Sequence, residues 1–224
     1  MQQAKVRSRR VRQHVNPLST RFAEPRAVAV SIPAHLGPDA PVDVELGCAD
    51  AQFSIALARA HPRRFVLGLE IREAVITKVL RRAAGVSNLH IAYCNLAVDL
   101  DRVLPERSVD RFHLLFPDPW FKPRHAKRRL LDPELVALLH SRLRDGGELH
   151  VATDVYELAL DAMFAVDVAQ CFENVAGPWR FIRDNPYGLT SRREDHVVRQ
   201  GVRVWRMRWR KAQPPDASAS IVGR

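Results

Sequence analysis

The feature that most constrains the fold is a mostly apolar run from Val109 to Phe116, which ends at two prolines bracketing one aspartate. Such a run is typical of a buried strand. Proline fixes φ and has no backbone N–H to donate, so the chain must leave the sheet at Pro117. Asp118 is therefore predicted to lie on a stiff turn at the carboxyl end of a strand, where open α/β sheets bind ligands.

A basic cluster follows that turn and consists of Lys122, Arg124, Lys127, Arg128 and Arg129. A carboxylate beside clustered cations suits a site that meets a polyanion and acts on it. Taken singly, an aspartate between prolines is most often a turn residue, and a basic run is most often a solvated surface. Their order directly after a strand favours the functional interpretation.

The charge of the whole chain supports the same kind of partner. Lys plus Arg is 35 and Asp plus Glu is 25, for a net charge of +10. This excess favours nucleic acid first and an anionic membrane second. No apolar run approaches the roughly 20 residues of a membrane span. Cys48, Cys94 and Cys171 form neither a zinc pattern nor a disulfide framework, so we expect no metal and a cytoplasmic location.

The composition divides the chain into three parts. Residues 1–40 are basic and poorly periodic, and we expect an arm and linker there. This arm either orders on a nucleic-acid backbone or merely keeps the protein soluble, and both interpretations stand. Residues 41–211 alternate between strand and helix patterns and form the predicted domain, and residues 212–224 form a flexible tail.

The alternation predicts an α/β fold with a mostly parallel seven-stranded sheet and an antiparallel edge. Strands are expected at 42–46, 65–70, 88–94, 109–116, 148–153, 179–182 and 202–209. The longer helices are expected to begin after Ala51, at Glu73, at Pro133 and at Val155, with Gly146-Gly147 ending the third. No long helix is expected between the last two strands, which can therefore pair in antiparallel fashion.

Polar residues lie at the ends of successive predicted strands: Glu45 with Gly47, then Glu70, Asn95, Asp118 and Asp154. The carboxyl ends of parallel strands meet at one edge of a sheet, so these residues predict a ligand crevice. The competing interpretation of each acid alone is a helix cap or a surface charge.

The turn after the first strand indicates which ligand fits. Ala49 and Ala51 stand where a diphosphate cradle would need glycines. An adenosine with a methionine-like tail does not need that cradle. Glu70 can accept hydrogen bonds from both ribose hydroxyls, and Asn95 can pair with an adenine edge.

The motifs VELGCA (44–49), LEIR (69–72), CN (94–95), FPDPWFK (116–122) with KRR (127–129), and TD (153–154) carry a resemblance. Together they resemble the bacterial tRNA (guanine-N7)-methyltransferase family, and RQHVNPL (12–18) is similar to its cyanobacterial and plant branch. The resemblance covers about residues 7–210. It implies a Rossmann-like class I S-adenosylmethionine-dependent methyltransferase fold. It also implies S-adenosylmethionine as donor and a variable-loop guanosine of tRNA as substrate. The sequence leaves both a monomer and a homodimer open.

The resemblance also implies residue roles. The donor would be contacted by Glu45, Gly47, Glu70, Arg72 and Asn95, and Asp118 would be the active-site residue beside the donor's methionine end. The substrate would be contacted by Lys122, Arg124, Asp154, Ser191 and Glu194. The last two replace the Thr-x-x-Glu of the family with Ser-x-x-Glu, and a helix capping box is the competing explanation for them.

Two other functions stay open at this point. One is a methyltransferase of the same fold that acts on another RNA or a small molecule, although the basic arm and cluster disfavour a small substrate. The other is a catalytically silent RNA-binding module, which Ala49, Ala51 and the altered Ser191/Glu194 pair would favour. A dehydrogenase is disfavoured because the glycine fingerprint is absent.

Overall fold

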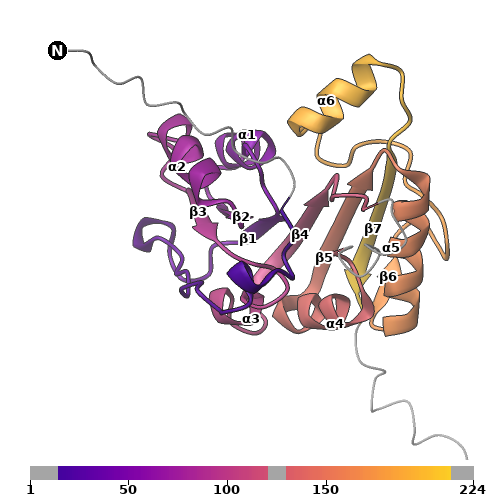
Figure 1. Ribbon diagram of the computed structural model, residues 1–224, viewed down its shortest axis with the longest axis horizontal. Helices are drawn as coiled ribbons and strands as arrows, with labels where there is room; N and C mark the ends of the chain where they lie inside the picture. The colour runs from indigo at the N-terminus through magenta and orange to yellow at the C-terminus, as the bar shows by residue number, and fades with distance from the viewer. Residues whose placement is uncertain (1–14, 121–129, 213–224) are drawn as a thin grey trace, which may run out of the picture.

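The computed structural model describes residues 15–120 and 130–212, and within them seven strands form one sheet in the order β3-β2-β1-β4-β5-β7-β6 (Figure 1). Five strands are parallel: β1 Val42–Leu46, β2 Phe65–Glu70, β3 Leu89–Tyr93, β4 Val109–Leu115 and β5 Leu143–Thr153. The last strand, β7 Trp205–Lys211, runs antiparallel to β5 and to β6 Phe172–Asn174. The predicted fold class is confirmed.

Helices cover both faces of this sheet. They are α1 Gln52–Ala60, α2 Glu73–Arg82, α3 Leu100–Val103, α4 Pro133–Arg142, α5 Tyr156–Ala169 and α6 Arg192–Arg199, with short 3-10 turns at Thr20–Phe22 and Ala34–Leu36. The alternation along β4 shows the two layers: Phe112 packs in the cluster that contains α4 and α5, whereas Leu115 packs with Phe53 and Leu57 of α1. None of the described helices has the length and apolar character needed to cross a membrane.

Local sequence signals set most of the element boundaries. Asp132 caps α4, because its side chain accepts a hydrogen bond of 2.8 Å from the backbone N–H of Leu135, and Pro133 occupies the first helical position. This is the predicted start of that helix. The predicted helices at Gln52, Glu73 and Tyr156 are present within one residue of their expected starts.

Two predicted strand boundaries are wrong. The fifth strand begins at Leu143 rather than at residue 148, and Gly146-Gly147 lies inside it. Its register shifts between Val109 and Arg111 of β4, so the glycines shape an irregular stretch of strand instead of ending the helix. Gly147 also approaches backbone closely, since a Cβ there would lie 2.9 Å from the carbonyl oxygen of Arg144. The seventh strand spans 205–211 rather than 202–209.

The strand predicted at 179–182 is wrong. The sixth strand is Phe172–Asn174, and residues 179–182 form a loop with a single bridge between Ile182 and Arg206. Gly177 and Trp179 both have positive φ, 95° and 55°, and Pro178 between them has no N–H to donate to a ladder. The helix α6, which follows this loop, was not predicted.

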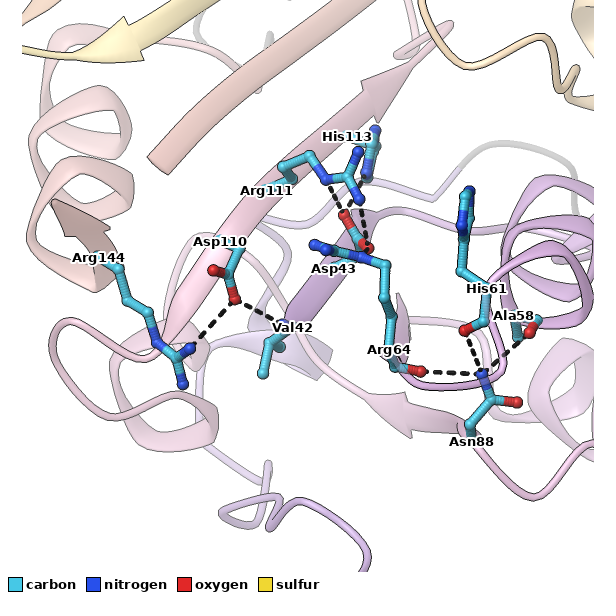
Figure 2. Close-up of polar contacts among 10 residues, drawn as sticks. All are labelled: Val42, Asp43, Ala58, His61, Arg64, Asn88, Asp110, Arg111, His113 and Arg144. Atoms are coloured by element: carbon cyan, nitrogen blue, oxygen red, sulfur yellow. Dashed lines mark hydrogen bonds and ion pairs between the residues drawn. The ribbon is translucent and has the colours of Figure 1, made fainter. Parts of the chain in front are cut away.

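A buried charge network joins the central strands below the site edge (Figure 2). The fully buried carboxylate of Asp43 on β1 pairs with Arg64, with Arg111 at 2.7 Å and with His113 at 3.1 Å. Nearby, the amide nitrogen of Asn88 lies within hydrogen-bond distance of the carbonyl oxygens of Ala58, His61 and Arg64, at 2.9, 3.1 and 2.8 Å. These contacts fix β1 against β4 and against the loop that enters β2.

The charged form of Asp43 is strongly favoured. Burial by itself raises the pKa of this carboxyl, but the hydrogen bonds of His113 and Arg64 and the charge of Arg111 outweigh it. They lower the pKa from 3.8 to about 2. The stabilisation is therefore present above about pH 4 and is lost as the pH falls toward 2.

We predict that Asp43→Asn lowers the free energy of unfolding at pH 7 by roughly 3–5 kcal/mol, because it leaves the partly buried guanidinium groups of Arg64 and Arg111 without their charge partner. Urea titration at pH 7 measures this, and the gap between wild type and variant should narrow below pH 4. The matched control is Asp145→Asn, whose pair with Arg107 is more than half exposed on both sides. Its effect should stay within about 1 kcal/mol. Equal losses in both variants would contradict the role given to Asp43.

Candidate active site

A cavity of about 1010 Å³ lies at the edge where the parallel strands end. Figure 1 shows the arrowheads of β4 and β5 pointing to this edge, with α6 beyond them and α3 at the opposite end. The cavity lining brings together these predicted site residues: Glu45, Gly47, Glu70, Arg72, Asn95, Asp118, Asp154 and Ser191. Glu194 lines a neighbouring pocket instead, and Lys122 and Arg124 lie outside the described residues.

The turn after β1 keeps a glycine-like path without the glycines. Gly47, Ala49 and Ala51 all have positive φ, of 74°, 48° and 52°. Two backbone hydrogen bonds hold the turn. The N–H of Cys48 donates to the carbonyl oxygen of Leu69 at 2.8 Å, and the N–H of Ala51 donates to the carbonyl oxygen of Cys48 at 2.7 Å. The two alanines therefore adopt the conformation that glycine adopts more readily, at a cost in backbone strain.

Glu45 supplies the helix cap that Ala51 cannot provide. Its Oε2 accepts hydrogen bonds from the backbone N–H of Ser54, at 3.1 Å, and from the Ser54 hydroxyl. The side chain thus reaches from the end of β1 to the first turn of α1, whose amides have no partner within the helix. Burial raises the pKa of this carboxyl to about 8, which the Ser54 hydrogen bonds only partly oppose.

Glu70 and Arg72 form one planar unit at the end of β2. Arg72 donates to Oε1 of Glu70 from its backbone N–H and from Nε, at 2.9 and 2.8 Å, and to Oε2 from Nη2, at 2.7 Å. The hydrogen bond to Glu70 raises the pKa of Arg72, and the charge of Asp118 raises it further. A carboxylate oxygen has more than one acceptor direction, so Glu70 can still accept from a bound ligand.

The side chain of Asn95 is buried and already fully bonded. Its Nδ2 donates to the carbonyl oxygens of Pro17 and Phe22, both at 3.0 Å, and its Oδ1 accepts from the N–H of Ala97 at 3.2 Å. Asp99 fixes the same region by accepting from the backbone N–H of Arg26 at 2.7 Å. In this structure Asn95 therefore fastens the 17–22 segment, and the expected contact with an adenine edge stays a prediction.

Asp118 lies on a turn with a strained backbone. Phe116 and Trp120, on either side of the Pro117-Asp118-Pro119 tripeptide, have positive φ of 51° and 42°. The N–H of Phe116 donates to the carbonyl oxygen of Ala152 at 2.7 Å, which ties the turn to β5. Bulky residues persist in such conformations only where the surroundings enforce them. Strained conformations of this kind are concentrated at functional sites.

The helix α6 closes the far side of the cavity. Ser191 is its N-cap, accepting from the N–H of Glu194 at 3.2 Å, as the competing capping explanation expected. Glu194 is buried and accepts from Arg206 at 2.5 Å and from Asn185 at 3.2 Å. Both side chains therefore have structural contacts, and their substrate roles stay predictions.

Several lining residues were not predicted as site residues. They belong to α6 and to the N-terminal segment: Arg192, Arg193, His196, Arg199, Val15 and Pro17. Arg193 pairs with Asp154 at 2.5 Å, and Arg192 pairs with Asp50 at 2.7 Å. The Ser191-x-x-Glu194 capping pattern was the available signal for a helix there. With Arg192 and Arg193 inside it and Arg199 after it, this pattern could have indicated a cationic helix.

Structures of known fold match this architecture. The aminoglycoside resistance methyltransferase NpmB1 superposes with a TM-score of 0.52 at 17% identity, over 83% of this chain and 98% of that one. A mutant form of the 16S rRNA (adenine(1408)-N(1))-methyltransferase of Catenulisporales acidiphilia, solved with cosubstrate SAM, gives 0.53 at 16%, over 79% and 87%. The likeness defines the class of fold: a class I methyltransferase fold, with the acid-lined cavity at its strand ends.

The sequence comparisons narrow this class to a family. Residues 39–207 match the family model described as "Putative methyltransferase". The tRNA (guanine-N(7)-)-methyltransferase of Synechococcus sp. (strain CC9902) is 36% identical over 217 residues, 92% of this chain and 91% of that protein. The Trichormus variabilis protein of the same name is 36% identical over 203 residues, 88% and 94%. The chain belongs to the tRNA (guanine-N7)-methyltransferase family.

The residues of the cavity fit S-adenosylmethionine. The carboxylates of Glu70 and Asp118 suit the ribose hydroxyls and the cationic sulfonium of the donor, and Ile71 and Val75 supply apolar wall beside Glu70. A Cβ added to Gly47 would meet nothing within 4 Å, so the turn leaves open space at that point. The residues that the structure describes include no cluster of three or more side chains placed to hold a metal.

We predict that Ala49→Gly raises the free energy of unfolding by about 0.5–1 kcal/mol. Alanine strain at positive φ is relieved, and the greater flexibility of glycine in the unfolded chain offsets only part of the gain. Ala49 is exposed, so no cavity is created. The matched control is Ala84→Gly, an exposed turn alanine outside the positive-φ set, which should lose stability. Urea titration measures both, and a loss in Ala49→Gly would contradict the strain argument.

We also predict that the stability of the protein falls as the pH rises, through Glu45. Its folded-state pKa of about 8 lies above the ordinary value of 4.5, so its contribution is full below pH 4.5 and is lost as the pH rises through 8. Relative to Glu45→Gln, wild type should lose more than about 1 kcal/mol of unfolding free energy between pH 5 and 8.5. Glu134→Gln, at an exposed site on α4, is the matched control and should show a much smaller drift. A constant difference for Glu45→Gln would refute the assignment.

Proposed function

We propose that this protein transfers a methyl group from S-adenosylmethionine to N7 of a variable-loop guanosine in tRNA. The observation that carries the proposal is identity of 36% to a tRNA (guanine-N(7)-)-methyltransferase across 92% of this chain and 91% of that protein. The acid-lined cavity at the carboxyl ends of the strands supports it, because ligands bind there in open α/β sheets.

The cofactor half of the site lies over β1 and β2. Glu70 accepts hydrogen bonds from the ribose hydroxyls, while Arg72 holds the Glu70 carboxylate in one plane. Gly47 leaves room for the donor over the turn after β1. Glu45 and Asn95 complete this half. Glu45 caps the first turn of α1, and Asn95 holds the 17–22 segment in place. When bound, the donor supplies an electrophilic methyl group on a sulfonium.

The substrate half has an orienting task and no proton to remove. Guanine N7 carries a lone pair without a proton, so in-line positioning accounts for most of the catalysis. A carboxylate that accepts from guanine N1–H and N2–H would set this orientation. We assign the task to Asp118, because it lines the cavity from the strained turn at the end of β4.

Positive charge surrounds that half and suits the phosphates of tRNA. The α6 side chains Arg192, Arg193 and Arg199 line the cavity. Lys122, Arg124 and the arm of residues 1–40 belong to the same proposal, with residues 41–211 as the methyltransferase domain and 212–224 as a flexible tail. A cytoplasmic location and a monomer or homodimer complete the proposal.

We predict that Asp118→Ala lowers kcat/KM by about 100-fold or more while donor affinity, measured by calorimetry, stays within about threefold. The assay is transfer of labelled methyl from S-adenosylmethionine to unmodified tRNA, with the product nucleoside identified. The matched control is Asp101→Ala on α3, an exposed acid at the opposite end, which should keep wild-type turnover.

Each outcome of that assay has a separate meaning. N7-methylguanosine from wild type supports the proposed function, and a different methylated nucleoside would replace the substrate while keeping the fold and donor. Full turnover by Asp118→Ala with the donor bound would remove Asp118 from its role. No transfer and no donor binding by wild type would favour a silent RNA-binding module.

A further inference from the structure

A cluster of three aromatic rings lies beside the substrate half of the cavity and has no part in the chemistry above. It consists of Tyr156 at the start of α5, Phe181 in the loop after β6 and Trp205 at the start of β7, and we call it the aromatic rim. The ring centroids of Tyr156 and Trp205 lie 4.6 Å apart, and those of Phe181 and Trp205 lie 4.9 Å apart. The guanidinium carbon of Arg203 lies 3.8 Å from the ring centroid of Trp205.

The register of the sheet places this rim next to the site. Trp205 pairs with Thr153 at the end of β5, and the next residue, Asp154, lines the cavity. Tyr156 follows two residues later. Because β7 is antiparallel, its first residue lies at the edge where the parallel strands end, on the side of the sheet order away from β1 and β2.

The rim is rigid but only partly buried. Phe181 adjoins Ile182, whose N–H donates to the carbonyl oxygen of Arg206 at 2.9 Å, so the loop is fixed to β7. Phe181 and Trp205 pack against the main core from its edge, whereas Tyr156 stays 45% exposed. A half-exposed aromatic ring held on fixed backbone offers a flat face at little entropic cost.

The charges at the rim favour an anionic partner with flat groups. Arg203 and Arg183 are exposed, and no carboxylate among the described residues pairs with either of them. Arg203 lies over Trp205, so its guanidinium can be covered by a second flat ring while it contacts a phosphate. Glu157, beside Tyr156, and Asp184, beside Arg183, are the opposing charges, but the charged group that lies on a rim ring is Arg203.

We infer that the aromatic rim is a stacking platform for an unpaired nucleotide of the RNA substrate, adjacent to the nucleotide that enters the cavity. The base would stack on Tyr156 and on the Arg203–Trp205 pair, and the guanidinium of Arg203 would contact its phosphate. Aromatic stacking together with arginine is how proteins hold single-stranded nucleotides without reading their sequence. This inference rests on the proposed RNA substrate and deepens it.

The test is the dissociation constant for an unmodified tRNA transcript, measured by filter binding at fixed salt with the full-length protein. Tyr156→Ala should weaken binding about fivefold or more, and Tyr156→Phe should restore it, since stacking needs the ring and not the hydroxyl. The matched control is Phe164→Ala, which removes an exposed ring two turns further along α5 and should leave tRNA binding unchanged.

Arg203 separates stacking from charge. Arg203→Ala should weaken binding and reduce the slope of log affinity against log salt by about one. Arg203→Lys should keep the salt dependence of tRNA binding but lose part of the affinity, because an ammonium group, unlike a guanidinium, has no flat face on which a base can stack. Arg102→Ala, at an exposed arginine of α3 on the opposite end, is the control and should keep both.

The outcomes distinguish this inference from the proposed function. Wild type that binds tRNA without methylating it would refute the proposed reaction, and the ratio of dissociation constants would still decide the platform. Wild-type affinity in Tyr156→Ala and Arg203→Ala would overturn the platform. The same affinity with a changed oligomeric mass would also overturn it, and would assign the rim to a protein contact.

Discussion

Two buried carboxylates on one strand, only two residues apart, have opposite electrostatic states, and the site depends on both. Asp43 is surrounded by Arg64, Arg111 and His113, which lower its pKa to about 2. Glu45 faces a hydroxyl and an amide, and burial raises its pKa to about 8. The first joins β1 to β4 and to the entrance of β2, and the second joins β1 to α1. Charge pairing fixes the base of the strand, while neutral hydrogen bonding shapes its tip.

The helix α6 connects the cofactor half of the site with the substrate half. On one side Gln52 and Asp50 of the α1 region bind Asp195 and Arg192, and on the other Glu194 binds Arg206 of β7. The cofactor half and the substrate half are thus tied to one eight-residue helix. Asp118, on its turn from β4, lies between them in the strand order. Positioning catalysis requires such a frame, because small displacements of either ligand reduce the rate.

The sequence predicted the parts of this molecule that local chemistry decides. Proline stops at Pro117, a cap at Asp132 and polar strand tips are all short-range signals, and they placed the sheet and its ligand edge correctly. The glycines Gly146-Gly147 predicted a helix end but lie inside β5. The strand pattern at 179–182 was overridden by Pro178 and by the positive φ of Gly177 and Trp179, which leave only a single bridge there. Asn95 shows the limit, because its partners Pro17 and Phe22 lie more than 70 residues away and leave no local signal.

That long-range bonding has a consequence for the order of events during synthesis. Pro17 and Phe22 leave the ribosome before Asn95 exists, and Arg26 leaves before Asp99. A growing chain acquires structure from its N-terminal side, so residues 17–26 remain without their partners until β1, β2 and β3 have been made. During that interval they are accessible to chaperones and proteases. Residues 17–26 are therefore among the first to be translated. Within the cofactor half of the site, they are among the last to be fixed in place.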